Sequence, residues 1–160
     1  MKALLIAGIG SPFGADQLGW HVVDNLKKKK DADGALQDCT FLKLDRPGPG
    51  LIESLQGYAR VILIDALQAG KPRGTLVRLD AEQISEQTAG LSSHNFGVAE
   101  AIALGRAMGQ LPQELVLFGL DAGESPDVAF ETSETKQLVE RVVRELSERG
   151  QFIPYPARGG

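Results

Sequence analysis

The sequence predicts a three-layer α/β domain, in which a mostly parallel sheet of about five strands carries helices on both faces. Two observations predict this class. Short apolar runs alternate with amphipathic segments, and the runs are almost continuously apolar, as in strands covered on both sides. A length of 160 residues with 42% hydrophobic residues fits one domain of common size. We expect this domain to span residues 1–150, followed by a partly ordered tail at 151–160 that contains two prolines.

Five apolar runs are expected to form the strands. Val61–Ile64 is the clearest buried strand and stops at Asp65, and Ala3–Ala7 is nearly as continuous. The run at 74–79 is more typical of an edge strand. In chain order, the expected strands lie at residues 3–7, 39–44, 61–64, 74–79 and 115–120.

Amphipathic segments between these runs predict the helices. The first is expected to begin at Asp16, because Leu18, Val22 and Leu26 recur at helical spacing, and its basic end lies at residues 27–30. The other expected helices lie at residues 51–58, 93–108 and 133–149. Loops or turns are expected at residues 8–14, 46–50, 66–73 and 81–91.

Charge and cysteine content exclude several classes of protein. The chain has 17 Lys and Arg against 21 Asp and Glu, so it has no broad basic surface for nucleic acid or anionic lipid. The single cysteine, Cys39, excludes an internal disulfide and a zinc site built on several cysteines. No apolar run approaches the roughly 20 residues of a membrane-spanning helix. Glycines and Pro12 interrupt the apolar start, so we interpret it as a strand rather than a signal peptide and expect a cytoplasmic protein.

Three polar residues are expected to meet where ligands bind in such sheets, beyond the carboxyl ends of the strands. Asp16 opens the helix after the first strand, Asp65 follows the third strand, and His94 begins the helix after the fourth. Two carboxylates and an imidazole suit a borderline divalent metal such as zinc or nickel. Each residue also has an ordinary explanation: a helix-start acid, a strand-end turn residue and a solvated first-turn histidine.

Other residues allow alternative interpretations. Gly8-Ile9-Gly10 after a strand is similar to a dinucleotide-binding loop, with Asp45 in the place of the ribose-binding acid. Phe13 replaces the third glycine of that loop, however, and Asp16 would repel a pyrophosphate. Asp45 and Asp121 are each ambiguous between a turn residue and a site residue. The serines lack the Gly-x-Ser-x-Gly pattern of a nucleophile elbow.

Four ordered blocks of the sequence resemble the [NiFe]-hydrogenase maturation proteases. They are Gly8–Pro12 with Asp16–Trp20, Val61–Ala66 with Gly74–Leu76, Leu91–Gly97, and Phe118–Leu120 with Ser125–Pro126. The resemblance implies an endopeptidase that removes a C-terminal extension from the hydrogenase large-subunit precursor after nickel insertion. It also implies that the metal contacts lie at Asp16, Asp65 and His94, and that the family's acid after the second strand is Asp45.

The chain departs from this family pattern in the surrounding loops. Ser11 replaces the usual Asn, and Ala15 stands where many members have a further acid. The stretch 46–49 replaces a Gly-Gly-Thr stretch, and Asp121-Ala122 replaces a Glu-Pro or Gln-Pro pair. These departures leave the substrate partner more open than the fold.

The residues and the resemblance together lead to one expected function. Asp16, Asp65, His94 and Asp45 are expected to be catalytic, in a family grouped with the aspartyl proteases. The first three are expected to contact one divalent metal, which is nickel brought by the substrate, with zinc or cadmium as substitutes. The expected partner is the hydrogenase large-subunit precursor, bound by a monomer, with no nucleic acid or membrane. The alternatives are a non-cleaving module of the same fold that docks a metalloprotein, and a nucleotide-binding protein that uses the Gly8–Gly10 loop.

Overall fold

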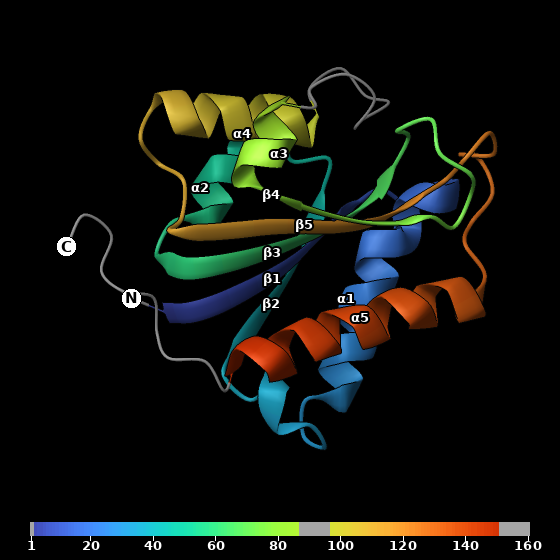
Figure 1. The fold of residues 1–160 in the computed structure, drawn as a ribbon, viewed down its shortest axis with the longest axis horizontal. Helices are drawn as coiled ribbons and strands as arrows, with labels where there is room; N and C mark the ends of the chain where they lie inside the picture. The colour runs from blue at the N-terminus through green and yellow to red at the C-terminus, as the bar shows by residue number, and fades with distance from the viewer. Residues whose placement is uncertain (1, 87–96, 151–160) are drawn as a thin grey trace.

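A five-stranded sheet forms the centre of the computed structural model, which describes residues 2–86 and 97–150 (Figure 1). The strand order is β2-β1-β3-β5-β4. β2, β1, β3 and β5 are parallel, and β4 is antiparallel to its neighbour β5. The strands are β1 (Lys2–Gly10), β2 (Cys39–Asp45), β3 (Tyr58–Leu67), β4 (Leu76–Asp80) and β5 (Glu114–Asp121). This arrangement confirms the predicted fold class, including the edge position of the fourth strand.

Helices cover both faces of the sheet and complete the predicted three layers (Figure 1). One face is covered by α1 (Leu18–Lys29) and α5 (Thr132–Gly150), and the other by α2 (Leu51–Leu55), α3 (Ala81–Glu86) and α4 (Val98–Ala107). The described residues also form short 3-10 helices, which are η1 (Gly14–Gln17), η2 (Gly34–Leu36) and η3 (Gly48–Gly50).

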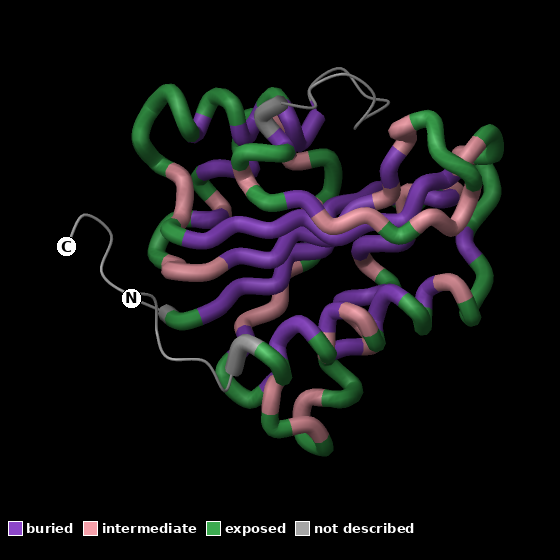
Figure 2. The backbone as a smooth tube through the Cα atoms, in the orientation of Figure 1, coloured by how far each residue is buried: buried purple, intermediate pink, exposed green. Residues whose placement is uncertain are grey.

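The alternation of side chains along each strand builds one hydrophobic cluster on each face. In β1, Leu4 and Ile6 belong to the cluster under α1 and α5, whereas Leu5 and Ala7 belong to the opposite cluster. Figure 2 shows that the central strands are buried along most of their length. Burial on both faces explains why these strands have almost continuously apolar sequences.

Two strands extend further than the sequence predicts. β1 continues through Gly8 and Gly10, which pair with Lys43 and Asp45 of β2, so the expected loop at 8–14 starts later. β3 continues to Leu67, so Asp65 lies inside the strand rather than after it. The sequence does not predict this continuation, because Asp65 is polar and a polar residue after an apolar run usually indicates the end of a buried strand.

Two predicted connections are also corrected. Residues 81–86, expected to be a loop, form α3, because Asp80 and Gln83 cap its first turn reciprocally with two hydrogen bonds of 2.9 Å. α2 ends at Leu55 instead of Tyr58, which already belongs to β3. Asp16 lies in η1, directly before α1, rather than in the first turn of an α-helix.

The direction of β4 corrects one step in the argument for His94. Asp80, at the end of β4, pairs with Val116 near the start of β5, so the end of β4 lies at the opposite edge of the sheet from Asp65. The position of His94 therefore cannot be derived from the carboxyl end of a fourth parallel strand. His94 itself, and the predicted start of its helix at Ser93, lie outside the described residues.

Among the helices of residues 2–86 and 97–150, none has the length and apolar character needed to cross a bilayer.

Candidate functional site

Three glycines let η1 and α1 approach the sheet at the candidate site. A Cβ added to Gly8 would lie 2.2 Å from the carbonyl oxygen of Gly19, and one added to Gly10 would lie 2.3 Å from that of Asp16. A Cβ on Gly19 would lie 2.6 Å from the carbonyl oxygen of Ile64 in β3. The two segments are thus in direct backbone contact. This contact brings Asp16, on η1, close to Asp65, the residue after Ile64.

The same contacts correct the dinucleotide-loop interpretation. Gly8 and Gly10 are strand residues whose missing side chains are needed for helix packing, so the Gly-Ile-Gly pattern does not form a phosphate-binding loop. The sequence shows that small residues are present at these positions, and the structure shows what they contact.

Asp16 is held by a local network at the start of η1. The Ser11 hydroxyl donates to Oδ2 of Asp16 at 3.1 Å, and the Ser11 amide donates to the Asp16 carbonyl at 3.2 Å. The side chain of Ser11 is buried. On the other side, the amide of Ala15 donates to the carbonyl of Pro126 at 3.0 Å. Ser11 is a site residue that differs from the family pattern, and its residue type alone does not predict its contact with Asp16.

Asp65 is an almost fully buried carboxyl group, with a relative exposure of 9%. Its Oδ1 accepts a hydrogen bond from the amide of Ala66 at 2.9 Å. Burial raises the pKa of Asp65 well above its ordinary value, and the negative charge of Asp16 raises it further. The two acids therefore interact electrostatically. Such a pair can hold a proton or can offer carboxylate oxygens to a cation.

Asp45 lies at the same edge of the sheet but apart from this pair. Its partner in β1 is Gly10, and β1 separates β2 from β3, so the backbones at Asp45 and Asp65 are two strand spacings, or about 10 Å, apart. The carboxylate of Asp45 is half exposed and forms an ion pair with Arg46 at 2.6 Å. The Arg46 guanidinium also lies 5.8 Å from the ring centre of Phe13, an exposed residue just before η1.

Asp121 has a structural role, which supports its interpretation as a turn residue. Its side chain is fully buried, and its carboxylate accepts three backbone hydrogen bonds of 2.8–3.2 Å, from Gly123, Ala69 and Lys71. These bonds occupy both carboxylate oxygens. Asp121 therefore organises the loops at this edge and is not available to a substrate.

The proposed third metal ligand is not part of the described chain. Within residues 2–86 and 97–150, no three His, Cys, Asp or Glu side chains are arranged so that they could hold a metal ion. Asp16 and Asp65 supply two of the expected ligands, and His94 lies outside the described residues. The metal contact of all three residues stays a prediction.

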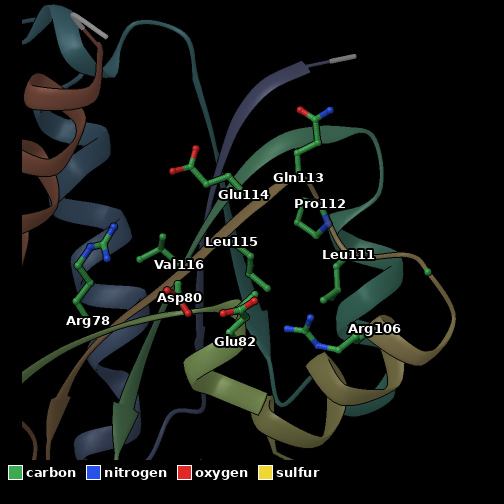
Figure 3. Close-up of a pocket in the computed structure, with 12 residues that line it drawn as sticks. Arg78, Asp80, Glu82, Arg106, Leu111, Pro112, Gln113, Glu114, Leu115 and Val116 are labelled. Carbon is green, nitrogen blue, oxygen red and sulfur yellow. The ribbon is translucent and has the colours of Figure 1, made fainter. Parts of the chain in front are cut away.

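A groove lies at the opposite edge of the sheet, where β4 ends and β5 begins (Figure 3). Its lining includes side chains of both charges, such as Arg106 and Glu82, and apolar side chains such as Leu111. Because Asp80 pairs with Val116 near the start of β5, this groove lies at the end of the strands away from Asp16 and Asp65. We therefore do not assign it to the candidate site.

Comparisons with known proteins agree on one family. A family model described as hydrogenase maturation protease matches residues 20–149, a range that includes Asp65 and starts just after Asp16. The hydrogenase expression/formation protein HoxM of Cupriavidus necator is 27% identical over 146 residues, which cover 89% of this chain and 69% of that protein. HupD of Thiocapsa roseopersicina is 27% identical over 153 residues, covering 94% of this chain and 67% of that protein.

Solved structures share the fold. The hydrogenase maturating endopeptidase HybD from E. coli has a TM-score of 0.71 and 19% identity, covering 92% of this chain and 94% of that chain. The [NiFe] hydrogenase maturation protease HybD from Thermococcus kodakarensis has a TM-score of 0.63 and 22% identity, covering 91% of this chain and 97% of that chain.

Proposed function

The chain belongs to the hydrogenase maturation protease family, and from this premise we propose that it is an endopeptidase that removes a C-terminal extension from a hydrogenase large-subunit precursor. The observation that carries this function is the family match, which extends over most of the domain and is accompanied by the same fold in solved maturation proteases.

We further propose that Asp16 and Asp65 recognise nickel in the precursor, with His94 as a third contact. The support is the acid pair itself: a buried carboxyl group lies beside a second carboxylate, and their like charges repel. A divalent cation that contacts both would relieve this repulsion. Because the pKa of Asp65 is raised, binding a cation there would displace a proton. Cleavage would then follow nickel insertion, since only a loaded precursor offers the cation.

The hydrolytic step needs a base for the attacking water and an acid for the leaving amine. The role of general acid is an alternative to the nickel contact at Asp65, because a bound cation would displace the proton. Without a cation, the raised pKa of Asp65 favours its protonated form, which can donate a proton. Asp16, with the Ser11 hydroxyl donating to its Oδ2, is suited to accept one. This division of roles would be that of an aspartyl protease. A role for Asp45 as base requires the substrate to reach across β1, and it stays a prediction.

The wider setting of the reaction follows from the same proposal. We propose a monomer that acts in the cytoplasm on the precursor, with no nucleic acid or membrane as partner. Zinc and cadmium would compete for the acid pair as nickel analogues, since both accept oxygen and nitrogen ligands.

The proposal is tested by incubating the purified chain with nickel-loaded precursor and following release of the C-terminal peptide. Asp16→Asn, Asp65→Asn and His94→Ala should each reduce the rate of cleavage at least about 100-fold. The matched control is Asp24→Asn, because Asp24 is a partly exposed acid on α1 whose carboxylate forms an ion pair with Lys43. Binding of the precursor without cleavage would favour the docking module instead. Normal cleavage by the Asp16 and Asp65 variants would remove the acid pair from the reaction.

Calorimetric titration with nickel, zinc or cadmium tests the metal contact separately. Weaker binding by each of the three variants, with binding by Asp24→Asn unchanged, supports a shared metal site. If all four variants bind the metal as tightly as the wild type, this result contradicts a shared metal site.

A further inference from the structure

Arg73 joins two loops at the carboxyl edge of the sheet. Its guanidinium contacts the ring of Phe130 at 4.5 Å from the centroid. Its two terminal nitrogens donate hydrogen bonds of 3.0–3.2 Å to backbone carbonyls of Ala122, Ser125, Val128 and Ala129. One side chain thus satisfies four carbonyls of the loop between β5 and α5, which we call the 122–131 loop.

Asp121 provides the opposite half of the same connection. Its carboxylate accepts hydrogen bonds from the amides of Ala69 and Lys71, which lie in the loop that carries Arg73. The backbones also exchange bonds: the Gly74 amide donates to the Asp121 carbonyl at 2.8 Å, and the Asp121 amide donates to the Thr75 carbonyl at 2.9 Å. Arg73 therefore satisfies backbone carbonyls of the 122–131 loop, and Asp121, the last residue of β5, satisfies backbone amides of the loop that carries Arg73. We call this arrangement the Arg73–Asp121 clamp.

The clamped 122–131 loop supports η1 directly. The carbonyl of Pro126 accepts the amide of Ala15 at 3.0 Å. A Cβ added to Gly14 would lie 2.6 Å from the same carbonyl oxygen, so the two backbones are in contact. Ala15 is buried at this junction and immediately precedes Asp16. A displacement of the loop would therefore be transmitted to Asp16 through one residue.

We propose that Arg73, together with Asp121, is a positioning residue that holds the 122–131 loop against η1 and so fixes the place of Asp16. The guanidinium is required because it presents five N–H donors in a planar fork, which can reach several carbonyls at once. A lysine would keep the charge but would offer one ammonium group on a flexible stem. The effect on the reaction rests on the proposed function, whereas the support of η1 does not.

The test compares Arg73→Ala and Arg73→Lys with a matched control, Arg78→Ala. Arg78 is also a partly buried arginine, and its guanidinium forms an ion pair of 2.8 Å with Glu145 of α5, so its truncation removes a contact to a different element. The first readout is hydrogen exchange at the Ala15 amide, measured by NMR. We expect exchange to become at least tenfold faster in both Arg73 variants and to stay unchanged in Arg78→Ala. The second readout is precursor cleavage at a temperature where all variants are folded. There kcat should fall about 10- to 100-fold in the Arg73 variants, with KM changed less than about twofold.

The outcomes separate the clamp from the proposed function. If Ala15 exchanges at the same rate in the Arg73 and Arg78 variants, the clamp does not support η1 and the inference is overturned. Full recovery by Arg73→Lys would overturn the requirement for the guanidinium fork. If the wild type does not cleave the precursor, the proposed function fails, and the exchange rates still decide whether the clamp exists. Arg73→Lys is the milder variant if Arg73→Ala does not fold.

Discussion

Gly10→Ala is expected to disturb the candidate site by pushing Asp16 away from the sheet. The added Cβ would lie 2.3 Å from the Asp16 carbonyl oxygen, whereas ordinary contact begins at 3.4 Å, so the two must separate by 3.4 − 2.3 = 1.1 Å. Both atoms belong to or adjoin backbone, so no side-chain rotation can relieve the overlap. The backbone of Gly10 has a negative φ, which leaves the steric overlap as the main effect.

This displacement has two expected consequences. Overpacking a tight contact costs about 1–3 kcal/mol of stability, and about 2–4 °C of Tm is lost per kcal/mol in a domain of this size. A misplacement of about 1 Å in a reacting group can reduce the rate about 100-fold. We therefore expect a moderate fall in Tm and a much larger fall in cleavage rate, measured at a temperature where the variant is fully folded.

Two glycine variants serve as controls. In Gly50→Ala the new Cβ would meet no atom within 4 Å, and φ is −66°, so stability should be unchanged or slightly raised. In Gly105→Ala the new Cβ would lie 2.6 Å from Cδ1 of Ile52, on the face of the sheet away from α1. That variant should lose stability and keep the activity of each folded molecule. If Gly10→Ala cleaves as fast as Gly105→Ala when both are folded, the position of Asp16 does not control the reaction.

Three further predictions test the shifted pKa values of Asp65, Glu145 and Cys39. Metal-free wild type should lose stability as the pH rises from the ordinary pKa of Asp towards the raised pKa of Asp65, because the folded state binds the Asp65 proton more tightly than the unfolded state. Asp65→Asn should remove this loss in thermal melts between about pH 4 and 8. A stability advantage of wild type over the variant that is larger at pH 8 than at pH 4 would contradict this prediction. Burial would raise the pKa of Glu145, but hydrogen bonds and charges from Arg78 and Arg141 outweigh it and lower this pKa. The ionised carboxylate of Glu145 therefore stabilises the fold above its ordinary pKa, and this stabilisation is lost as the pH falls through the lowered pKa. Urea melts should show a smaller loss of stability at acid pH in Glu145→Gln than in wild type, and equal losses would show that ionisation of Glu145 is not coupled to folding. Burial raises the pKa of the Cys39 thiol to about 11. A disulfide reagent at pH 8 should therefore modify this thiol only after the protein unfolds. Rapid labelling of the folded protein would contradict the burial of Cys39.

The sheet could be predicted because burial on both faces leaves a direct mark on the sequence. Val61–Ile64 needs apolar side chains on each side of the sheet, because successive residues of a strand point to opposite faces. The sequence pattern does not indicate strand direction, so it does not predict that β4 is antiparallel to β5. The sequence pattern does not predict α3, because the start of this helix depends on the reciprocal caps of Asp80 and Gln83 more than on an apolar stripe.

The candidate site could be predicted only in part. The sequence predicts Asp16 and Asp65 because both follow apolar runs at one edge of the sheet, and the structure brings them close enough to interact. The sequence does not predict the roles of Ser11 and Arg73, because these roles depend on contacts and not on residue type. Arg73 bonds to residues about fifty positions away, and neither its own neighbours nor theirs form a recognisable motif. Asp45 matched the family by position, but its distance from Asp65 depends on the order of the strands.

The central claim is that this chain cleaves a hydrogenase large-subunit precursor after nickel has been inserted. The most direct measurement is the intact mass of the precursor, followed over time with the wild-type chain, for nickel-loaded and nickel-free samples side by side. The account predicts that the loaded precursor loses one C-terminal peptide at a single bond, while the nickel-free precursor keeps its mass. Equal cleavage of the two samples would contradict the recognition of nickel, and an unchanged mass in both would contradict the proposed endopeptidase.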